Sequence, residues 1–136
     1  MKVFIVIAGI MVLLVGGFFL FSEPSSDENS SPQISNNEVS IETINSDVEN
    51  GALFLDVRTP EEFADSYISG AENYPLQELQ QGIMPSVEKQ DKIYVYCRSG
   101  NRSAEAKTIL ENSGFTNVVD LGGLEDVVSI GGVRVN

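Results

Sequence analysis

Apolar residues are distributed in two different ways along this chain. From Val3 to Phe21 they run for 19 residues without a charged or polar side chain, whereas from about Val39 onward they occur in short runs between polar segments. A helix rising about 1.5 Å per residue would span roughly 28 Å over the first run, which matches the hydrocarbon core of a bilayer. We therefore predict a membrane element at residues 1–22 and a folded domain at residues 39–136.

The membrane element could be retained or removed. Its end, residues 19–22, reads FLFS and is bulky where a signal peptidase prefers small side chains. This favours an uncleaved signal anchor over the alternative, a cleaved signal peptide. Lys2 precedes the apolar run and acidic residues follow it, so we expect the N-terminus in the cytoplasm and the domain outside, tethered to the cytoplasmic membrane through residues 3–21. Cleavage would instead give a secreted or periplasmic protein.

Residues 23–38 are rich in serine, asparagine and acidic side chains. Such a segment buries too little apolar surface to offset the entropy lost on ordering. We predict a disordered linker between the membrane element and the domain.

Strand and helix signals alternate within residues 39–136. Short β-branched or aromatic runs at 52–57, 92–97 and 117–122 predict buried strands, and the segments 60–67 and 102–114 predict helices. This alternation is typical of an α/β fold with a parallel sheet and helices on both faces. In such sheets the functional crevice lies beyond the carboxyl ends of the strands.

The composition excludes several kinds of chemistry. The chain has no histidine and one cysteine, so it holds no Ser-His-Asp triad, Cys-His dyad, histidine metal site or internal disulfide. Its 20 acidic and 8 basic side chains give a net charge of −12, which argues against nucleic acid as a partner. We expect no metal and no cofactor, and a monomer.

The single cysteine, Cys97, lies at the end of a predicted strand. The sequence CRSGNRS then leads into a helix that we expect to begin near Arg102 or Ser103. Gly100 permits a tight turn, backbone N–H groups can point inward, and the helix N-terminus adds partial positive charge. Two arginines join this loop in a domain with 7 basic and 16 acidic side chains, a net charge of −9. We therefore predict an activated thiolate in an anion-binding loop.

Four segments resemble the rhodanese-like family and together cover nearly all of residues 39–136. They are LFLDVRTPEEF at 53–63, YISGAENYPL at 67–76, VYCRSGNRSAEA at 95–106 and GFTNVVDLGGLEDV at 114–127. The resemblance implies an α/β domain built on a five-stranded, mainly parallel sheet with helices on both faces. It also implies sulfur transfer by a ping-pong mechanism.

The resemblance further implies roles for single residues. Cys97 would take a sulfane sulfur from thiosulfate or a similar small anionic donor, carry it as a covalent persulfide, and pass it to cyanide or a thiol. Arg98 and Arg102 would attract the donor, and Asp56 and Arg58 would support the fold as an ion pair. Backbone N–H groups of the loop would stabilise the persulfide. The substrate-binding loop implied in this way comprises Arg98, Ser99, Gly100, Asn101, Arg102 and Ser103.

Two positions depart from the family pattern. Tyr67 stands where a histidine is common, and Val127 stands where a tryptophan usually follows the Gly-Gly pair of the last helix. We expect the first change to alter the rim of the sheet and the second to give a smaller or looser packing of the final helix. Neither change touches the cysteine loop.

Three other functions share features with this pattern. A phosphatase or arsenate reductase would need an arginine six residues after the cysteine, but that position is Ser103 and the loop is one residue too short. A non-enzymatic, membrane-tethered interaction module would not need Cys97. A persulfide carrier or redox sensor with a dedicated partner would use the same cysteine but a different acceptor.

Overall fold

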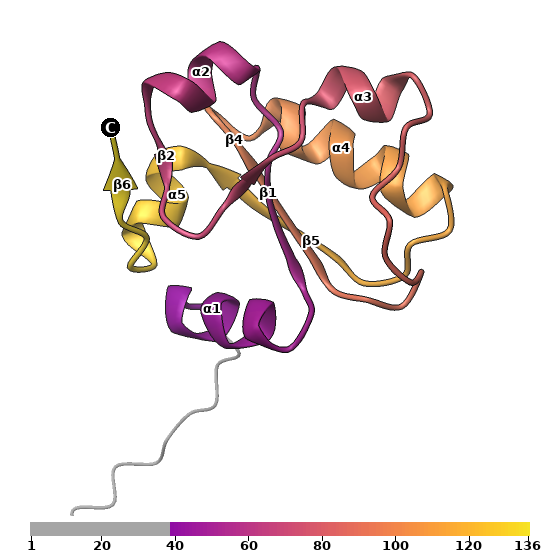
Figure 1. Ribbon diagram of the computed structural model, residues 1–136, viewed down its shortest axis with the longest axis horizontal. Coiled ribbons are helices and arrows are strands. Elements are labelled where there is room, and N and C mark those ends of the chain that lie inside the picture. The colour runs from indigo at the N-terminus through magenta and orange to yellow at the C-terminus, as the bar shows by residue number, and fades with distance from the viewer. Residues whose placement is uncertain (1–38) are drawn as a thin grey trace, which may run out of the picture. The chain divides into compact units, whose positions relative to one another are not determined.

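The computed structural model describes residues 39–136. Within that range helices and short strands alternate along the chain (Figure 1). In chain order they are α1 (Ile41–Glu49), β1 (Leu53–Asp56), α2 (Pro60–Asp65), β2 (Tyr67–Ile68), β3 (Glu72–Asn73), α3 (Leu76–Gln80), β4 (Ile93–Cys97), α4 (Asn101–Asn112), β5 (Val118–Gly123), α5 (Leu124–Ser129) and β6 (Arg134–Val135).

The predicted membrane element at residues 1–22 and the predicted linker at residues 23–38 lie outside the described residues and stay predictions. Among residues 39–136, no helix combines the length and the apolar character that crossing a bilayer requires.

The main sheet has four strands in the order β3-β1-β4-β5, and all of its pairs are parallel. The prediction of a mainly parallel α/β fold is confirmed, but the expected fifth strand is absent from this sheet within residues 39–136. The short strand β2 instead pairs antiparallel with β6, next to the C-terminus. The backbone N–H of Ile68 in β2 donates to the hydroxyl of Tyr96 at 3.0 Å, so β2 meets the main sheet through a side chain.

The main sheet separates two apolar cores because successive residues of a strand point to opposite faces. Along β4, Ile93, Val95 and Cys97 belong to one core, and Tyr94 and Tyr96 belong to the other. Helices α3 and α4 cover the first core, and α1 and α5 cover the second (Figure 1). Cys97 therefore ends a strand that is buried on both faces, which gives its loop a rigid base.

The helix predicted at 60–67 is shorter than its sequence suggests. It ends two residues earlier, because Ser66 adopts an extended conformation with φ −165° and ψ 150° and Tyr67 begins β2. Its start is fixed by a capping box, in which the Thr59 hydroxyl accepts from the Glu62 N–H and the Glu62 carboxylate accepts from the Thr59 N–H. This box holds the Glu62 side chain at the start of α2, beside the carboxyl edge of the sheet.

The two positions that depart from the family pattern are both well packed. The ring of Tyr67 stacks on that of Phe63, with 4.5 Å between the ring centroids. Val127 is fully buried, and the backbone of Gly132 lies so close that a Cβ there would come within 2.7 Å of the Val127 carbonyl oxygen. The final helix is therefore closely packed despite its smaller side chain.

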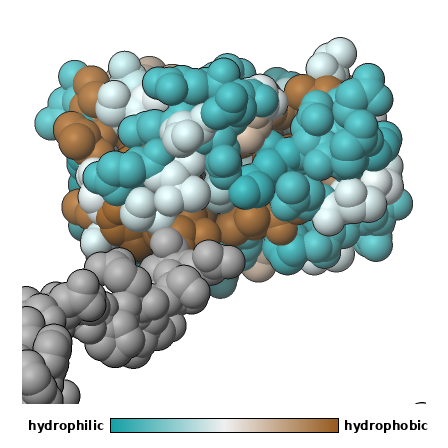
Figure 2. All heavy atoms as spheres, turned by 90° about the horizontal axis from the view of Figure 1, so that it is seen from below, coloured by the Kyte–Doolittle hydropathy of each residue, from teal (hydrophilic) through white to brown (hydrophobic). Residues whose placement is uncertain are grey.

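One face of the domain is mainly hydrophilic. Figure 2 shows one face, on which hydrophilic side chains cover most of the area and apolar ones occupy a limited part. Large apolar side chains exposed within residues 39–136 are Ile83, Val128 and Val133. The domain thus places most of its large apolar side chains in the two cores.

Candidate active site

Cys97 lies at the carboxyl end of β4, between the ends of β1 and β5. It is paired in register with Gly123, and an irregularity in the β4–β5 register lies between Val95 and Cys97. The residue is fully buried and is the free cysteine of the chain. The strand end, the turn and the start of α4 therefore enclose the sulfur, as the sequence predicted for this segment.

Polar groups of the loop lie next to the Cys97 sulfur. The N–H of Gly100 donates to Sγ at 3.0 Å, and the hydroxyl oxygen of Ser103 lies 3.7 Å from it. Burial raises the pKa of the thiol, but hydrogen bonds from the backbone and hydroxyl of Ser103 and from the backbone of Ser99 and Gly100 outweigh it, so the pKa of Cys97 is lowered. The loop therefore favours the thiolate, which is the nucleophilic form of cysteine.

Two glycines allow this geometry. Gly100 has φ +95°, a left-handed conformation that residues with a Cβ rarely adopt, and it directly precedes α4. A Cβ at Gly123 would lie 2.9 Å from the Arg98 carbonyl oxygen, so a glycine is needed there for β5 to approach the cysteine loop. The sequence indicated the first of these requirements but not the second.

Ser103 is fully buried beneath the loop. Its hydroxyl can donate to the carbonyl oxygen of Gly100 at 2.9 Å or to that of Gly122 at 3.2 Å. This residue occupies the position at which a phosphatase of the C-x5-R type would need an arginine. A buried neutral hydroxyl cannot supply the charge that such a loop places around a phosphate.

Arg102 is held in an ion pair. Its two terminal nitrogens contact the two carboxylate oxygens of Glu62 at 2.6 and 2.9 Å, across 40 residues of sequence. Hydrogen bonds from Arg102 lower the pKa of Glu62 to about 2. Both side chains are about 30% exposed, at 32% and 28%. The positive charge of Arg102 is therefore largely compensated by Glu62.

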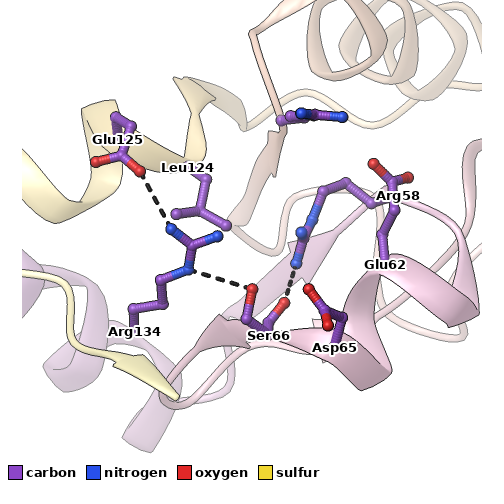
Figure 3. A pocket seen from close by; sticks show the side chains of 8 residues that line it. Arg58, Glu62, Asp65, Ser66, Leu124, Glu125 and Arg134 are labelled. Carbon is purple, nitrogen blue, oxygen red and sulfur yellow. Dashed lines mark hydrogen bonds and ion pairs between the residues drawn. The ribbon is translucent and has the colours of Figure 1, made fainter. Parts of the chain in front are cut away.

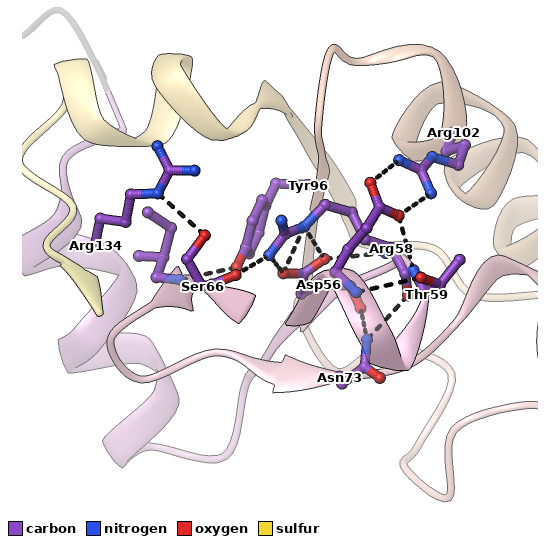
Figure 4. Close-up of polar contacts among 10 residues, drawn as sticks. Asp56, Arg58, Thr59, Ser66, Asn73, Tyr96, Arg102 and Arg134 are labelled. Carbon is purple, nitrogen blue, oxygen red and sulfur yellow. Dashed lines mark hydrogen bonds and ion pairs between the residues drawn. The ribbon is translucent and has the colours of Figure 1, made fainter. Parts of the chain in front are cut away.

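Asp56 and Arg58 form a second, buried ion pair at the end of β1 (Figure 4). The Asp56 carboxylate accepts from the Arg58 backbone N–H at 3.0 Å and from its guanidinium at 2.6 to 3.0 Å. Arg58 also donates to the carbonyl oxygen of Ser66 at 2.5 Å, and Asn73 donates to the carbonyl oxygens of both partners of the pair. This network ties the loop after β1 to β2 and β3, so it supports the edge on which the site lies.

A pocket of about 420 Å³ adjoins the cysteine loop at Arg98 (Figure 3). Cys97 itself does not line it. Charged side chains dominate its wall, and they come from α2, from the residues that follow β1 and β4, and from the starts of α5 and β6. Its lining residues are Arg58, Glu62, Asp65, Ser66, Arg98, Leu124, Glu125 and Arg134.

The predicted loop residues differ in their contacts and exposure. Gly100 and Ser103 contact the sulfur, Arg98 lines the pocket, and Arg102 is paired with Glu62. Ser99 is exposed and forms a bridge with Gly123. Asn101 is the first residue of α4 and is exposed.

Several residues of the pocket carried no local signal in the sequence. Glu62, Ser66, Glu125 and Arg134 line it from elements other than the cysteine loop. Glu62 belongs to the PEEF segment and could have been paired with a loop arginine by charge alone. Nothing near Arg134 in sequence points to the site, because its contact with Ser66 spans 68 residues.

This arrangement suits nucleophilic chemistry by the Cys97 thiolate. A thiolate surrounded by N–H donors attacks well, and the same donors can stabilise a negative charge that moves one atom further out. Within residues 39–136 no group of His, Cys, Asp and Glu side chains is arranged to hold a metal ion.

Comparisons with known proteins agree with this geometry. Residues 40–129 match the family model of the rhodanese-like domain. The thiosulfate sulfurtransferase PspE of Escherichia coli is 41% identical over 75 residues, covering 54% of this chain and 72% of that protein. The chloroplastic thiosulfate sulfurtransferase 16 of Arabidopsis thaliana is 37% identical over 84 residues, covering 54% and 70% respectively.

Solved structures show the same similarity. A rhodanese from E. coli, solved with anions, is 38% identical with a TM-score of 0.54, covering 62% of this chain and 98% of that one. A rhodanese-like domain from Anabaena sp. is 34% identical with a TM-score of 0.55, over the same shares. These relationships support a sulfurtransferase activity in general. Because the family model spans most of the described domain and the cysteine loop lies within the match, the chain belongs to the rhodanese-like family.

Proposed function

We propose that this protein transfers a sulfane sulfur from thiosulfate or a similar anionic donor, through a persulfide on Cys97, to cyanide or a thiol. The observation that carries the proposal is the buried Cys97 sulfur at a strand end, which accepts from the Gly100 N–H at 3.0 Å and whose pKa is lowered by hydrogen bonds of the loop. Curated relatives named thiosulfate sulfurtransferases support the choice of donor.

In the first half of the reaction the Cys97 thiolate attacks the outer sulfur of thiosulfate. A bond forms between Sγ and that sulfur while the sulfur–sulfur bond of thiosulfate breaks, and sulfite leaves with the electron pair. The negative charge then lies on the terminal sulfur of the persulfide. Because the N–H groups of Ser99, Gly100 and Ser103 already lower the pKa of the thiol, they are well placed to stabilise this charge as well.

Arg98 is the cation that attracts the donor in this proposal. It follows Cys97 directly, it is exposed, and it forms no ion pair within residues 39–136. Arg102 shares its charge with Glu62 and contributes less.

In the second half of the reaction an acceptor removes the terminal sulfur. Cyanide or a thiolate attacks it, the bond to Sγ breaks, and the electron pair returns to Cys97 as thiolate. No oxidant or reductant enters either half, so the cycle needs no cofactor.

The proposal is tested by intact-protein mass spectrometry after incubation with thiosulfate. We expect the full chain to gain the mass of one sulfur atom, to lose it on adding cyanide with formation of thiocyanate, and to show no gain in the Cys97→Ser variant. Ser99→Ala is the matched control, because this exposed hydroxyl forms no hydrogen bond within residues 39–136, and it should still be loaded. A wild-type chain that takes up no sulfur at any thiosulfate concentration would contradict the proposal and favour an interaction module.

A further inference from the structure

The pocket beside the cysteine loop contains charges of both signs, and some of them are already neutralised within the domain. Arg58 is bound to the Asp56 carboxylate and to the Ser66 carbonyl, and it is only 4% exposed. Glu62 is bound by both terminal nitrogens of Arg102. These two lining residues form the fixed wall of the pocket, since rearranging them would uncover a buried or bidentate ion pair.

The other charged residues of the pocket form either no ion pair or a weak, exposed one. Among residues 39–136, neither Arg98 nor Asp65 forms an ion pair. Arg134 and Glu125 are 3.4 Å apart, with side chains 48% and 79% exposed. Exposed pairs of this kind contribute about 0–1 kcal/mol, so a ligand can replace either partner at little cost.

Arg134 is already turned toward the pocket. Its Nε donates to the hydroxyl of Ser66 at 3.2 Å, and Arg58 binds the carbonyl oxygen of the same serine (Figure 3). One edge of the Arg134 guanidinium is thus anchored, whereas its terminal nitrogen Nη1 has only the loose contact with Glu125. A carboxylate in the pocket could take the place of Glu125 and accept hydrogen bonds from an oriented guanidinium.

The available groups therefore comprise two cations, Arg98 and Arg134, and two anions, Asp65 and Glu125, around about 420 Å³. That volume lies in the range of sites for small molecules. A ligand with only one sign of charge would leave two like charges of the pocket without a partner. A ligand that carries both an ammonium and a carboxylate group would instead find a partner of opposite charge in each set.

We propose that this pocket binds the sulfur acceptor, and that the acceptor is a small zwitterionic thiol with an amino-acid-type head group. Arg134 would bind the carboxylate and Asp65 the ammonium group, while the thiol reaches past Arg98 to the persulfide. The inference rests on the function proposed above and names the substrate class of its second half. Arg134 and Asp65 are specificity-determining residues in this scheme.

The transfer step balances without a further reagent. The thiol loses its proton to solvent, its thiolate attacks the terminal sulfur of the Cys97 persulfide, and the new sulfur–sulfur bond forms on the acceptor. The bond to Sγ breaks with its electron pair on Cys97. The product is a persulfide of the zwitterionic thiol, and Cys97 is regenerated as thiolate.

The test separates the two halves of the reaction. The full chain, kept in detergent solution, is loaded with thiosulfate and freed of excess donor, and its sulfur content is verified by mass. Transfer is then timed with three thiols, namely cysteine, which carries both charges, 3-mercaptopropionate, which carries the carboxylate alone, and cysteamine, which carries the ammonium alone. Each variant is compared with wild type for the same thiol, so differences in intrinsic thiol reactivity cancel.

Replacing Arg134 should impair acceptors with a carboxylate selectively. We expect Arg134→Gln to lower kcat/KM for cysteine and 3-mercaptopropionate about tenfold, which corresponds to one charged hydrogen bond, and to change that for cysteamine by less than about twofold. Lys89→Gln is the matched control, since it removes one positive charge from a side chain that lies over the Phe115 ring and does not line the pocket.

Replacing Asp65 should give the complementary pattern. Asp65→Asn should lower kcat/KM for cysteine and cysteamine about threefold, because the residue is exposed, and leave 3-mercaptopropionate nearly unchanged. Glu61→Gln on the same helix is the control, since Glu61 is exposed and does not line the pocket.

The outcomes distinguish the two proposals. If the wild-type chain takes up no sulfur from thiosulfate, both the function and the acceptor class are wrong. If it is loaded normally but the variants slow all three thiols equally, or slow loading as much as transfer, the zwitterion proposal alone is overturned. Selective losses that follow the charge of the thiol would support it.

Discussion

The loops after β1 and β4 leave adjacent strands of the same sheet, yet they use their polar groups in opposite ways. After β1, the Asp56 carboxylate and the Arg58 guanidinium bind each other, and both are almost completely buried. After β4, the backbone N–H groups turn toward the Cys97 sulfur, and Arg98 stays exposed without an ion pair in the described part of the chain. The polar groups of the first loop bind one another, so that loop is structural. The second loop leaves a positive charge and N–H donors available to a ligand.

Arg102 lies between these two cases. It belongs to the cysteine loop by sequence, but Glu62 binds it from α2 in a partly exposed ion pair. The positive charges of the three arginines therefore form a series. The charge of Arg58 is fully compensated by a carboxylate, that of Arg102 is largely compensated, and that of Arg98 is uncompensated. This series predicts that substitutions affect stability most in the first loop and donor binding most in the second.

The largest effect should come from breaking the buried pair. Asp56→Asn leaves the Arg58 guanidinium buried without a counter-ion, and we expect a loss of about 3–5 kcal/mol in the free energy of unfolding. Urea unfolding followed by circular dichroism measures it. The control is Glu111→Gln, which removes the partner of Lys107 in an exposed i,i+4 pair and should cost no more than about 0.5 kcal/mol. Similar losses in the two variants would show that the β1 loop is not the structural one.

The intermediate effect concerns donor binding. Arg98→Gln removes the uncompensated cation, and we expect the rate of loading by thiosulfate to fall about tenfold, with a smaller fall for an uncharged organic trisulfide. The fair comparison is the double variant Arg102→Gln with Glu62→Gln, because it deletes a whole ion pair and leaves the local net charge unchanged. That variant should load within about threefold of wild type. A tenfold loss in the double variant alone would assign the donor to Arg102 instead.

Local sequence patterns predicted the parts of this molecule that are themselves local. The strand that ends at Cys97, the glycine turn and the helix after it are adjacent in sequence, and propensity and spacing were enough to place them. Ser103 lies in the first turn of the helix that follows the loop, and this position places it beside Sγ. The Asp56–Arg58 pair joins residues two apart, so the resemblance to a family motif was sufficient to indicate it.

The features that escaped prediction depend on contacts between distant segments. Strands β2 and β6 have two residues each, which is too short for any periodic signal, so their pairing and the four-stranded main sheet could not be foreseen. The Arg102–Glu62 pair and the Arg134–Ser66 contact join different elements. The sequence therefore predicted the same role for Arg98 and Arg102, although only the charge of Arg102 is compensated in the fold.

The smallest effect should come from adjusting the environment of the sulfur itself. Ser103→Ala removes a hydroxyl 3.7 Å from Sγ that helps to lower the pKa of Cys97, while the Gly100 N–H remains in place. The thiolate is present above the pKa of Cys97 and lost below it, so raising that pKa moves the pH midpoint of alkylation upward and slows the reaction at neutral pH. We expect about threefold slower alkylation by iodoacetamide at pH 7, measured by intact mass, and no change with the control Ser99→Ala. An unchanged midpoint in Ser103→Ala would mean that backbone N–H groups alone activate the cysteine. The contrast with the β1 loop would then be sharper, because the activation of the thiol would depend on no other side chain.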